Sequence, residues 1–285
     1  MDRREALRNI GTSAVVPALF QLGAGKRSGG VVGRLKQSVS YWPYGRIPLA
    51  QFAAQAKQIG LSAIDLLQPE EWPVVRDAGL VSSMGYPSKR RDFLSRGFNN
   101  LANHDLLVDE IEQTLPLAAA AGVPNIIAMF GNRNGRPDDE GAANCIAGLS
   151  RVKASAERHG VTVCVELLNS KVDHKDYMGD RTAFGVQVMQ SVNSPRVKLL
   201  YDIYHMQIME GDVIRTIRNN LAHIGHFHTG GVPGRNEIDG SQELNYGAVA
   251  RAIADAGFTG YLAHEFVPKR DPLTSLAEAF KLCDV

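Results

Sequence analysis

The sequence predicts an α/β protein in which one (β/α)8 barrel forms almost the whole chain. From Leu35 onward, short apolar runs rich in β-branched residues alternate with longer helical patterns, which is typical of repeated βα units and a parallel sheet. Eight such runs can be counted, and no linker divides them into two domains. The 285 residues are 44% hydrophobic. That is enough for a single barrel, since barrels of this type need about 250 residues.

The eight apolar runs are the expected strands. They lie at residues 37–42, 63–67, 80–84, 125–130, 162–167, 198–201, 224–228 and 261–265. Several are apolar on both faces, as expected for a parallel sheet covered on both sides. A doubly wound open sheet is the alternative. The barrel is favoured because no GxGxxG motif follows the first strand.

Helical patterns fill the intervals between the strands. Residues 48–60 place Leu49, Phe52 and Ala56 on one face, and residues 105–122 begin at Asp105, a residue type that caps helices well. These two segments and a third, 245–257, each end in glycine, which is common just after a helix. The repeated ending indicates short turns that lead from a helix into the next strand.

The first 30 residues have the order of a twin-arginine export signal. Arg3, Arg4 and Arg8 precede an apolar stretch over residues 10–24. Pro17 interrupts this stretch, which is also too short for a stable membrane span. We therefore expect a signal peptide and linker over 1–30, a barrel over 31–285 and a periplasmic location, or a cytoplasmic one if the segment is only a tail.

Charge and cysteine content exclude two classes of function. The net charge is +1 and the lysines and arginines are dispersed, so no basic surface for nucleic acid is expected. The three cysteines are widely spaced and form no CxxC pair, which argues against a disulfide framework and a zinc knuckle.

The last four expected strands each end in a side chain that can bind a metal. These residues are Glu166, Asp202, His228 and Glu265. In a barrel the carboxyl ends of the strands converge on one mouth. Three carboxylates buried there would raise one another's pKa unless a cation compensated them. This oxygen-rich set predicts one divalent ion, Mn²⁺ or Mg²⁺, with Co²⁺ or Zn²⁺ as alternatives.

The seventh strand offers two histidines for this site. His226 and His228 alternate and so share one face, and the alternation alone leaves both as candidates. We expect His228, nearer the carboxyl end, to reach the mouth, and His226 to lie one layer deeper. His264 should point away from its neighbour Glu265.

Four segments together resemble the hydroxypyruvate isomerase family. They are VELLNSKVDHKDY, YDIYHMQIMEGD, GHFHTGGVPGRNEIDGSQELNY and YLAHEFVP. That family is one of the xylose-isomerase-like barrels, which also include the tagatose/psicose 3-epimerases and endonuclease IV. The resemblance implies a (β/α)8 barrel with one divalent metal at its mouth. By motif, Glu166, Asp202 and Glu265 match metal ligands, and Glu166 and Glu265 also match the acid/base pair. His205 in YDIYH and Arg235 in VPGR match substrate-contacting residues.

The activity that the resemblance implies is isomerisation of a small sugar or a hydroxy or keto acid through an enediolate. The resemblance departs at His228, because cytoplasmic hydroxypyruvate isomerases have glutamine as the metal ligand at this position. The HFH segment of this chain is more similar to the 3-epimerases. Ketose 3-epimerisation is therefore one alternative, and a catalytically silent sugar-binding barrel is another. DNA repair is disfavoured because the first four strands end in apolar residues and supply no further zinc ligands. We also expect homo-oligomers, and a solvated loop around Lys171 and His174.

Overall fold

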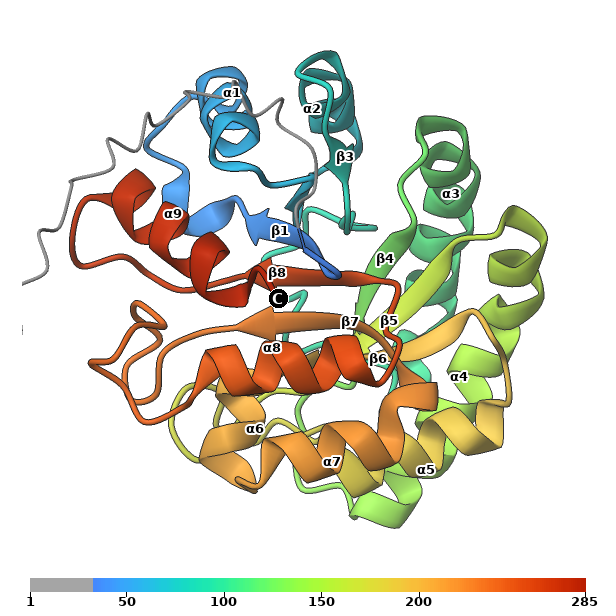
Figure 1. Ribbon diagram of the computed structural model, residues 1–285. Helices are drawn as coiled ribbons and strands as arrows, with labels where there is room; N and C mark the ends of the chain where they lie inside the picture. The colour runs from blue at the N-terminus through green and yellow to red at the C-terminus, as the bar shows by residue number, and fades with distance from the viewer. Residues whose placement is uncertain (1–32) are drawn as a thin grey trace, which may run out of the picture.

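The computed structural model describes residues 33–285, so the expected signal segment lies outside the described residues. Eight strands alternate with helices along this part of the chain (Figure 1). The strands are β1 Lys36–Ser40, β2 Ala63–Asp65, β3 Val81–Ser82, β4 Asn125–Met129, β5 Thr162–Glu166, β6 Val197–Asp202, β7 Ile224–Thr229 and β8 Tyr261–His264. All eight expected strands are present, and no bound differs from the expected one by more than two residues.

The strands form one parallel sheet in the order β3-β2-β1-β8-β7-β6-β5-β4. Each strand except β3 and β4 pairs with both of its neighbours in the chain, and the first strand pairs with the last. A doubly wound sheet would instead reverse its strand order in the middle. The barrel predicted from the sequence is therefore confirmed.

The sheet closes on itself at Gly85, beyond the end of β3. The Gly85 backbone N–H donates to the Asn125 carbonyl at 2.9 Å, and its carbonyl accepts from the Ile127 N–H at 3.0 Å. A Cβ at this position would lie 2.6 Å from the Trp72 ring and 3.0 Å from Ile126. Glycine is therefore required for the close approach that joins β3 to β4.

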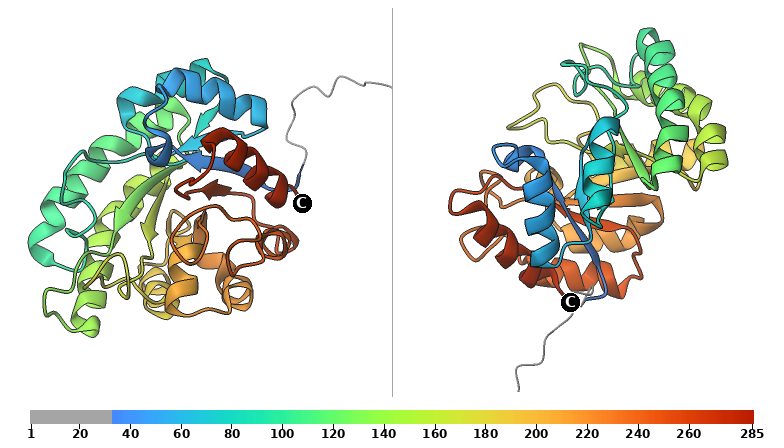
Figure 2. Two further views of the ribbon diagram at one scale, coloured as in Figure 1. Left: turned by 90° about the vertical axis from the view of Figure 1, so that its left-hand side faces the viewer. Right: turned by 90° about the horizontal axis from the view of Figure 1, so that it is seen from above.

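Helices surround the barrel on its outside (Figure 2). They are α1 Leu49–Ile59, α2 Trp72–Asp77, α3 His104–Ala121, α4 Asp138–His159, α5 Thr182–Val192, α6 Ile203–Met209, α7 Val213–Asn220, α8 Tyr246–Asp255 and α9 Pro272–Cys283. As predicted, α3 stops at Gly122, whose φ of 71° is left-handed and whose N–H bonds back to the Ala118 and Ala119 carbonyls. Between residues 33 and 285, none of the helices is both long and apolar enough to span a bilayer.

Polar side chains occupy part of the barrel interior below its mouth. Ser38 Oγ lies 2.6 Å from Ser83 Oγ, which donates to Asp65 at 2.8 Å, and all three residues are buried. Ordinary barrels fill this space with branched apolar residues. This hydrogen-bonded base supports the residues at the mouth.

Candidate active site

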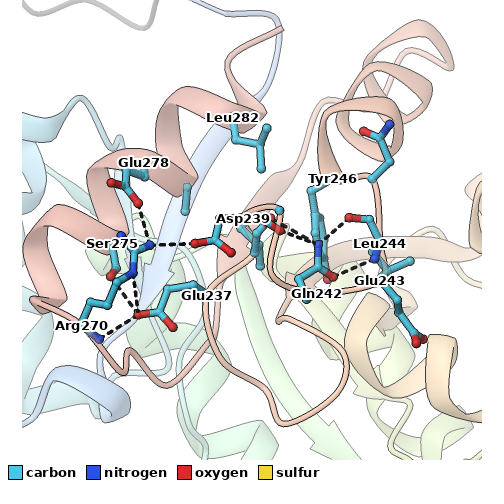
Figure 3. Close-up of a pocket in the computed structure, with 14 residues that line it drawn as sticks. Glu237, Asp239, Gln242, Glu243, Leu244, Tyr246, Arg270, Ser275, Glu278 and Leu282 are labelled. Atoms are coloured by element: carbon cyan, nitrogen blue, oxygen red, sulfur yellow. Dashed lines mark hydrogen bonds and ion pairs between the residues drawn. The ribbon is translucent and has the colours of Figure 1, made fainter.

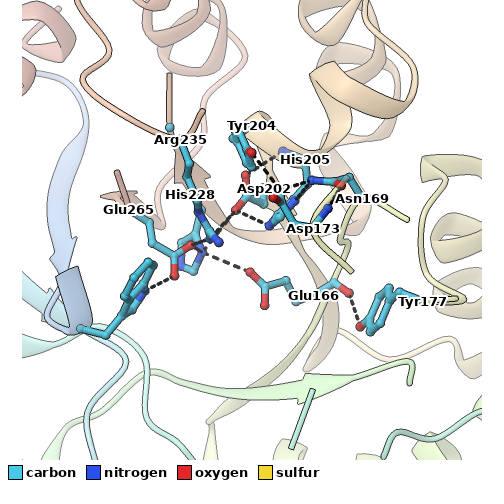
Figure 4. A network of polar contacts seen from close by, with 12 residues as sticks. Glu166, Asn169, Asp173, Tyr177, Asp202, Tyr204, His205, His228, Arg235 and Glu265 are labelled. Atoms are coloured by element: carbon cyan, nitrogen blue, oxygen red, sulfur yellow. Dashed lines mark hydrogen bonds and ion pairs between the residues drawn. The ribbon is translucent and has the colours of Figure 1, made fainter. Parts of the chain in front are cut away.

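Four side chains meet at the carboxyl ends of consecutive strands (Figure 4). Glu166 ends β5, Asp202 ends β6, His228 lies in β7 and Glu265 directly follows β8. Their nearest ligating atoms all lie within 4.8 Å of one another, and all four residues are buried. The structure thus brings together the residues that the sequence grouped as metal ligands.

The donor set suits a divalent cation. His228 Nδ1 lies 2.7 Å from Glu265 Oε2, 3.3 Å from Glu166 Oε1 and 4.0 Å from Asp202 Oδ2. Three buried carboxylates this close repel one another. A hard divalent ion coordinated by their oxygens and by one imidazole nitrogen would remove that repulsion.

The pKa values of the clustered groups reflect the same crowding. Burial raises the pKa of Asp202 to about 7; Glu265 and Glu166 add to the rise, and the Arg235 guanidinium opposes it. Burial would also raise the pKa of Glu265, but Arg235 and His228 outweigh it and hold that pKa well below its usual range. Burial lowers the pKa of His228, yet the carboxylates around it raise that pKa well above its ordinary value. The site therefore holds protons that a metal ion would displace.

Asp65, which was not predicted from the sequence as a site residue, lies directly beneath the cluster. Its Oδ2 is 2.7 Å from His228 Nε2 and 3.2 Å from His226 Nε2, and all three side chains are buried. Burial opposes ionisation, but the two histidines hold the pKa of Asp65 well below its usual range. An ionised carboxylate can only accept, so His228 carries hydrogen on Nε2. Its Nδ1 is thereby directed at Glu166 and Glu265 as the ligating atom.

The two other histidines of the last strands lie where the sequence placed them. His226 is one layer deeper than His228, with ring centroids 5.3 Å apart. His264 points away from the cluster, since its Nε2 lies 2.9 Å from Gln37 Oε1. Burial lowers the pKa of His264 to about 3, so the ring is neutral.

His205 faces the cluster from the first turn of α6. Its backbone N–H donates to Asp202 Oδ1 at 3.1 Å, so Asp202 caps the helix that carries it. Its Nε2 lies 3.6 Å from Asp202 Oδ2. Burial, reinforced by Arg235, lowers the pKa of His205 well below its ordinary value.

Arg235 reaches the cluster from the loop after β7. Its Nη2 donates to Glu265 Oε2 at 2.6 Å and lies 3.4 Å from Asp202 Oδ2. The guanidinium also lies over the rings of Trp42 and Tyr204, 5.4 and 5.5 Å from their centroids. Arg235 has φ 56°, a conformation that non-glycine residues rarely adopt and that costs about 1–3 kcal/mol.

A cavity of about 280 Å³ opens onto these groups. Arg235, Glu166 and Glu265 line one side, and Trp42, Leu66, Tyr86, Leu94, Ile127, Met129 and Leu168 form most of the remaining wall. His174 also lines the cavity, so the expectation that it belongs to a solvated loop was wrong. Lys171 lies elsewhere, because its Nζ donates to the Ile208 and Met209 carbonyls.

The family is decided by a match that extends over nearly all of the described chain. Residues 32–283 match the family model described as "Xylose isomerase-like TIM barrel". The chain belongs to the xylose isomerase-like TIM barrel family.

Curated relatives of this barrel include isomerases. A protein of Homo sapiens named "Putative hydroxypyruvate isomerase" is 26% identical over 270 residues, covering 93% of this chain and 91% of its own. The "2-oxo-tetronate isomerase" of Cupriavidus necator is 30% identical over 233 residues, covering 78% of this chain and 87% of its own.

Solved structures support the fold of this xylose isomerase-like barrel. One titled as an AP endonuclease, family 2, from Brucella melitensis has a TM-score of 0.77 at 22% identity, covering 86% of this chain and 98% of its own. A D-psicose 3-epimerase solved in the presence of D-fructose has a TM-score of 0.68 at 18% identity, covering 87% and 96%.

A second cavity, of about 590 Å³, lies on the flank of the barrel between the loop after β7 and α9 (Figure 3). Arg270 forms ion pairs there with Asp239 at 2.9 Å and Glu278 at 2.7 Å. The four clustered residues at the mouth do not line this cavity. We therefore place the candidate active site at the mouth.

Proposed function

We propose that the protein is a metal-dependent isomerase of a small sugar or a hydroxy or keto acid, similar to hydroxypyruvate isomerase. The relatives' activities support an isomerase or epimerase of this family. The observation that carries the proposal is the pair Glu166 and Glu265, which line one cavity from β5 and from the end of β8 and share a cluster with Asp202 and His228.

The reaction needs a proton to be removed from a carbon beside a carbonyl and then returned. One divalent ion held by Glu166, Asp202, His228 and Glu265, preferably Mn²⁺ or Mg²⁺ and alternatively Co²⁺ or Zn²⁺, would supply positive charge for the developing enediolate. Glu265 is held as a carboxylate by Arg235 and His228, so it can accept a proton at neutral pH. Glu166, which reaches the same cavity from β5, would exchange the second proton.

The cavity indicates a small substrate. Its volume of about 280 Å³ lies just below the range of about 300–1,000 Å³ that is usual for drug-sized ligands. Arg235 and His205 would hold the oxygen-bearing end beside the acidic cluster. The apolar wall around Tyr86 and Met129 would receive the carbon chain.

The test separates metal binding from proton transfer. Glu265→Gln and the wild type are compared for bound Mn²⁺ and for uptake of deuterium from D₂O into hydroxypyruvate, D-fructose and D-psicose. We expect Glu265→Gln to exchange at least about 10²-fold more slowly, as is typical when a general acid or base is lost. Glu278→Gln, on the flank, is the matched control. Full exchange by Glu265→Gln would remove Glu265 from the proton-transfer pair.

Ketose 3-epimerisation is the second candidate. It is favoured by His228 in the cluster, because the HFH segment that contains His228 is more similar to the 3-epimerases. The two reactions share the proton removal and differ in product. Conversion of D-fructose to D-psicose would identify an epimerase, and conversion of hydroxypyruvate to its aldehyde isomer would identify the isomerase. A metal-loaded protein that binds these compounds without turnover or exchange would contradict both.

We also propose that the protein is exported to the periplasm by the twin-arginine route and forms homo-oligomers. The support for export is the order of Arg3, Arg4 and the apolar stretch in residues 1–30. Fractionation of cells that produce the chain with and without an Arg3→Lys, Arg4→Lys change tests export, and light scattering tests the oligomeric state. Cytoplasmic retention of the unchanged chain would contradict export.

A further inference from the structure

The Asn169 side chain, three residues beyond Glu166, is fully buried and uses both ends of its amide (Figure 4). Its Oδ1 accepts from the backbone N–H groups of Val172 at 3.0 Å and Asp173 at 2.9 Å. Its Nδ2 lies 2.7 Å from Asp173 Oδ2 and 2.6 Å from His205 Nδ1. A flipped amide would face its NH₂ toward two N–H donors and its oxygen toward a carboxylate. These contacts therefore fix its orientation.

This orientation decides which nitrogen of His205 carries the hydrogen. An amide nitrogen donates and cannot accept, so His205 Nδ1 must be the acceptor. A neutral ring then carries its hydrogen on Nε2. A protonated ring is disfavoured, because its additional N–H, on Nδ1, would face the amide N–H of Asn169.

The Nε2–H of His205 is directed toward the acidic cluster. Within residues 33–285, no group hydrogen-bonds this buried atom. The ring is held from two sides, because the His174 and Tyr204 rings contact it edge-on at centroid distances of 5.2 and 5.0 Å. Tyr204 also donates to Asp173 Oδ2 at 2.8 Å, which holds the carboxylate that Asn169 uses.

We propose that Asn169 is a positioning residue that fixes His205 as a neutral Nε2–H donor to a substrate oxygen. The role toward substrate rests on the proposed function, whereas the tautomer does not. A fixed donor aimed at an oxygen that gains negative charge in the transition state accelerates such reactions, and losing one costs about 10²–10³-fold in kcat. Asn169 would act through His205 and touch no substrate itself.

The test exchanges the two side chains that set the tautomer. In the double variant Asn169→Asp, Asp173→Asn the total charge is unchanged. The new carboxylate at 169 can only accept, so it requires a hydrogen on His205 Nδ1. Long-range ¹H–¹⁵N spectra of the ¹⁵N-labelled, metal-free full chain report which ring nitrogen is protonated, and loss of a signal in His205→Gln assigns it.

We expect the Nε2–H tautomer in the wild type and the Nδ1–H tautomer in the double variant. Asp173→Asn alone is the matched control, and it should keep the Nε2–H form because Asn169 is unchanged. An Nδ1–H or doubly protonated His205 in the folded wild type would overturn the proposal. So would an unchanged tautomer in a folded double variant.

Kinetics and metal binding separate this proposal from a structural role. In the deuterium-uptake assay with the compound that the wild type exchanges fastest, kcat of the double variant should fall about 10²–10³-fold. Its Mn²⁺ affinity should stay within about threefold, because Asn169 contacts none of the four clustered residues. A tautomer that flips without a loss of kcat would overturn the positioning role. If the wild type exchanges none of the compounds, the proposed function fails while the tautomer remains measurable.

Discussion

His228 Nε2 lies 2.7 Å from Asp65 Oδ2, while Nδ1 of the same ring faces Glu166 and Glu265. A buried carboxylate that accepts from one ring nitrogen orients the ring and raises the basicity of the other nitrogen. Asp65 should therefore govern metal affinity without contacting the metal. We expect Asp65→Ala to weaken Mn²⁺ binding by about 10–100-fold in calorimetry.

Two further variants sharpen this prediction. Asp65→Asn keeps an oxygen that can accept from His228 Nε2 and loses only the charge, so its affinity should lie between those of Asp65→Ala and the wild type. Asp77→Ala removes an exposed carboxylate on α2 and should leave Mn²⁺ binding unchanged. Wild-type affinity in a folded Asp65→Ala protein would contradict the prediction.

The mouth residues could be predicted because each ends an apolar run. Glu166 follows VTVCV and Asp202 follows VKLLY, so a charge marks the point where the buried strand stops. Asp65 gave no such signal, since Leu66 and Leu67 follow it and extend the run. In the structure β2 ends at Asp65, and Leu66 turns away with φ 58°. A charge inside an apolar run was the only sign of it in the sequence.

Features that depend on contacts between separate segments could not be predicted. Asn169 lies in a polar loop whose sequence does not distinguish it from other loops. Its role comes from its contacts with Asp173 and His205. Closure of the barrel at Gly85 depends on the approach of Trp72 and Ile126. Alternation and spacing describe neighbours in the sequence, so they identify the strands and miss these contacts.

Arg235 should stabilise the metal-free protein. Its guanidinium pairs with both Glu265 and Asp202 when no divalent ion is bound. Removing one partner of a buried ion pair typically costs about 3–5 kcal/mol. We expect Arg235→Met to lower the free energy of unfolding by about 3 kcal/mol in urea with a chelator.

Saturating Mn²⁺ provides the control for Arg235→Met. The ion would then neutralise the carboxylates, so the difference between variant and wild type should shrink to less than half. A loss of equal size with and without Mn²⁺ would show that Arg235 stabilises the loop by packing on Trp42 and Tyr204 and not by charge.

Metal affinity should rise with pH from about 5 to about 8. The pKa of Asp202 is raised to about 7 by burial and by Glu265 and Glu166, and the pKa of His228 is raised well above its ordinary value by the carboxylates. Below pH 7 an ion must therefore displace at least about one proton, so protons compete with it. Calorimetry in two buffers of different ionisation enthalpy measures the protons released.

The free energy of unfolding of the metal-free protein should fall as the pH rises, whereas the metal affinity increases. A carboxyl group whose pKa is raised on folding binds protons more tightly in the folded state, so the stabilisation from Asp202 is lost as pH rises from about 4 to about 7. Asp202→Asn abolishes this titration and should flatten the profile measured in chelator. An Mn²⁺ affinity independent of pH between 5 and 8 would contradict the raised pKa values.

Glu237 should hold the Arg235 loop in place from the flank cavity (Figure 3). Its Oε1 accepts from the backbone N–H groups of Lys269 at 2.9 Å and Arg270 at 3.0 Å and from Ser275 Oγ at 3.0 Å. These bonds tie the loop after β7 to the start of α9, two residues from Arg235. One bond to a charged group contributes about 1.5–3 kcal/mol, and these three donors share a single oxygen, so their contributions do not simply add.

We expect Glu237→Ala to lower the free energy of unfolding by about 2–3 kcal/mol and to raise KM more than it lowers kcat, because Arg235 would lose its fixed position. Glu237→Gln keeps an accepting oxygen and should show less than half of either effect. Glu243→Ala, exposed on the same loop, should match the wild type in both measurements. If Glu237→Ala lost stability but had the same KM as Glu243→Ala, Glu237 would contribute to folding only. Arg235 would then be positioned by its own contacts.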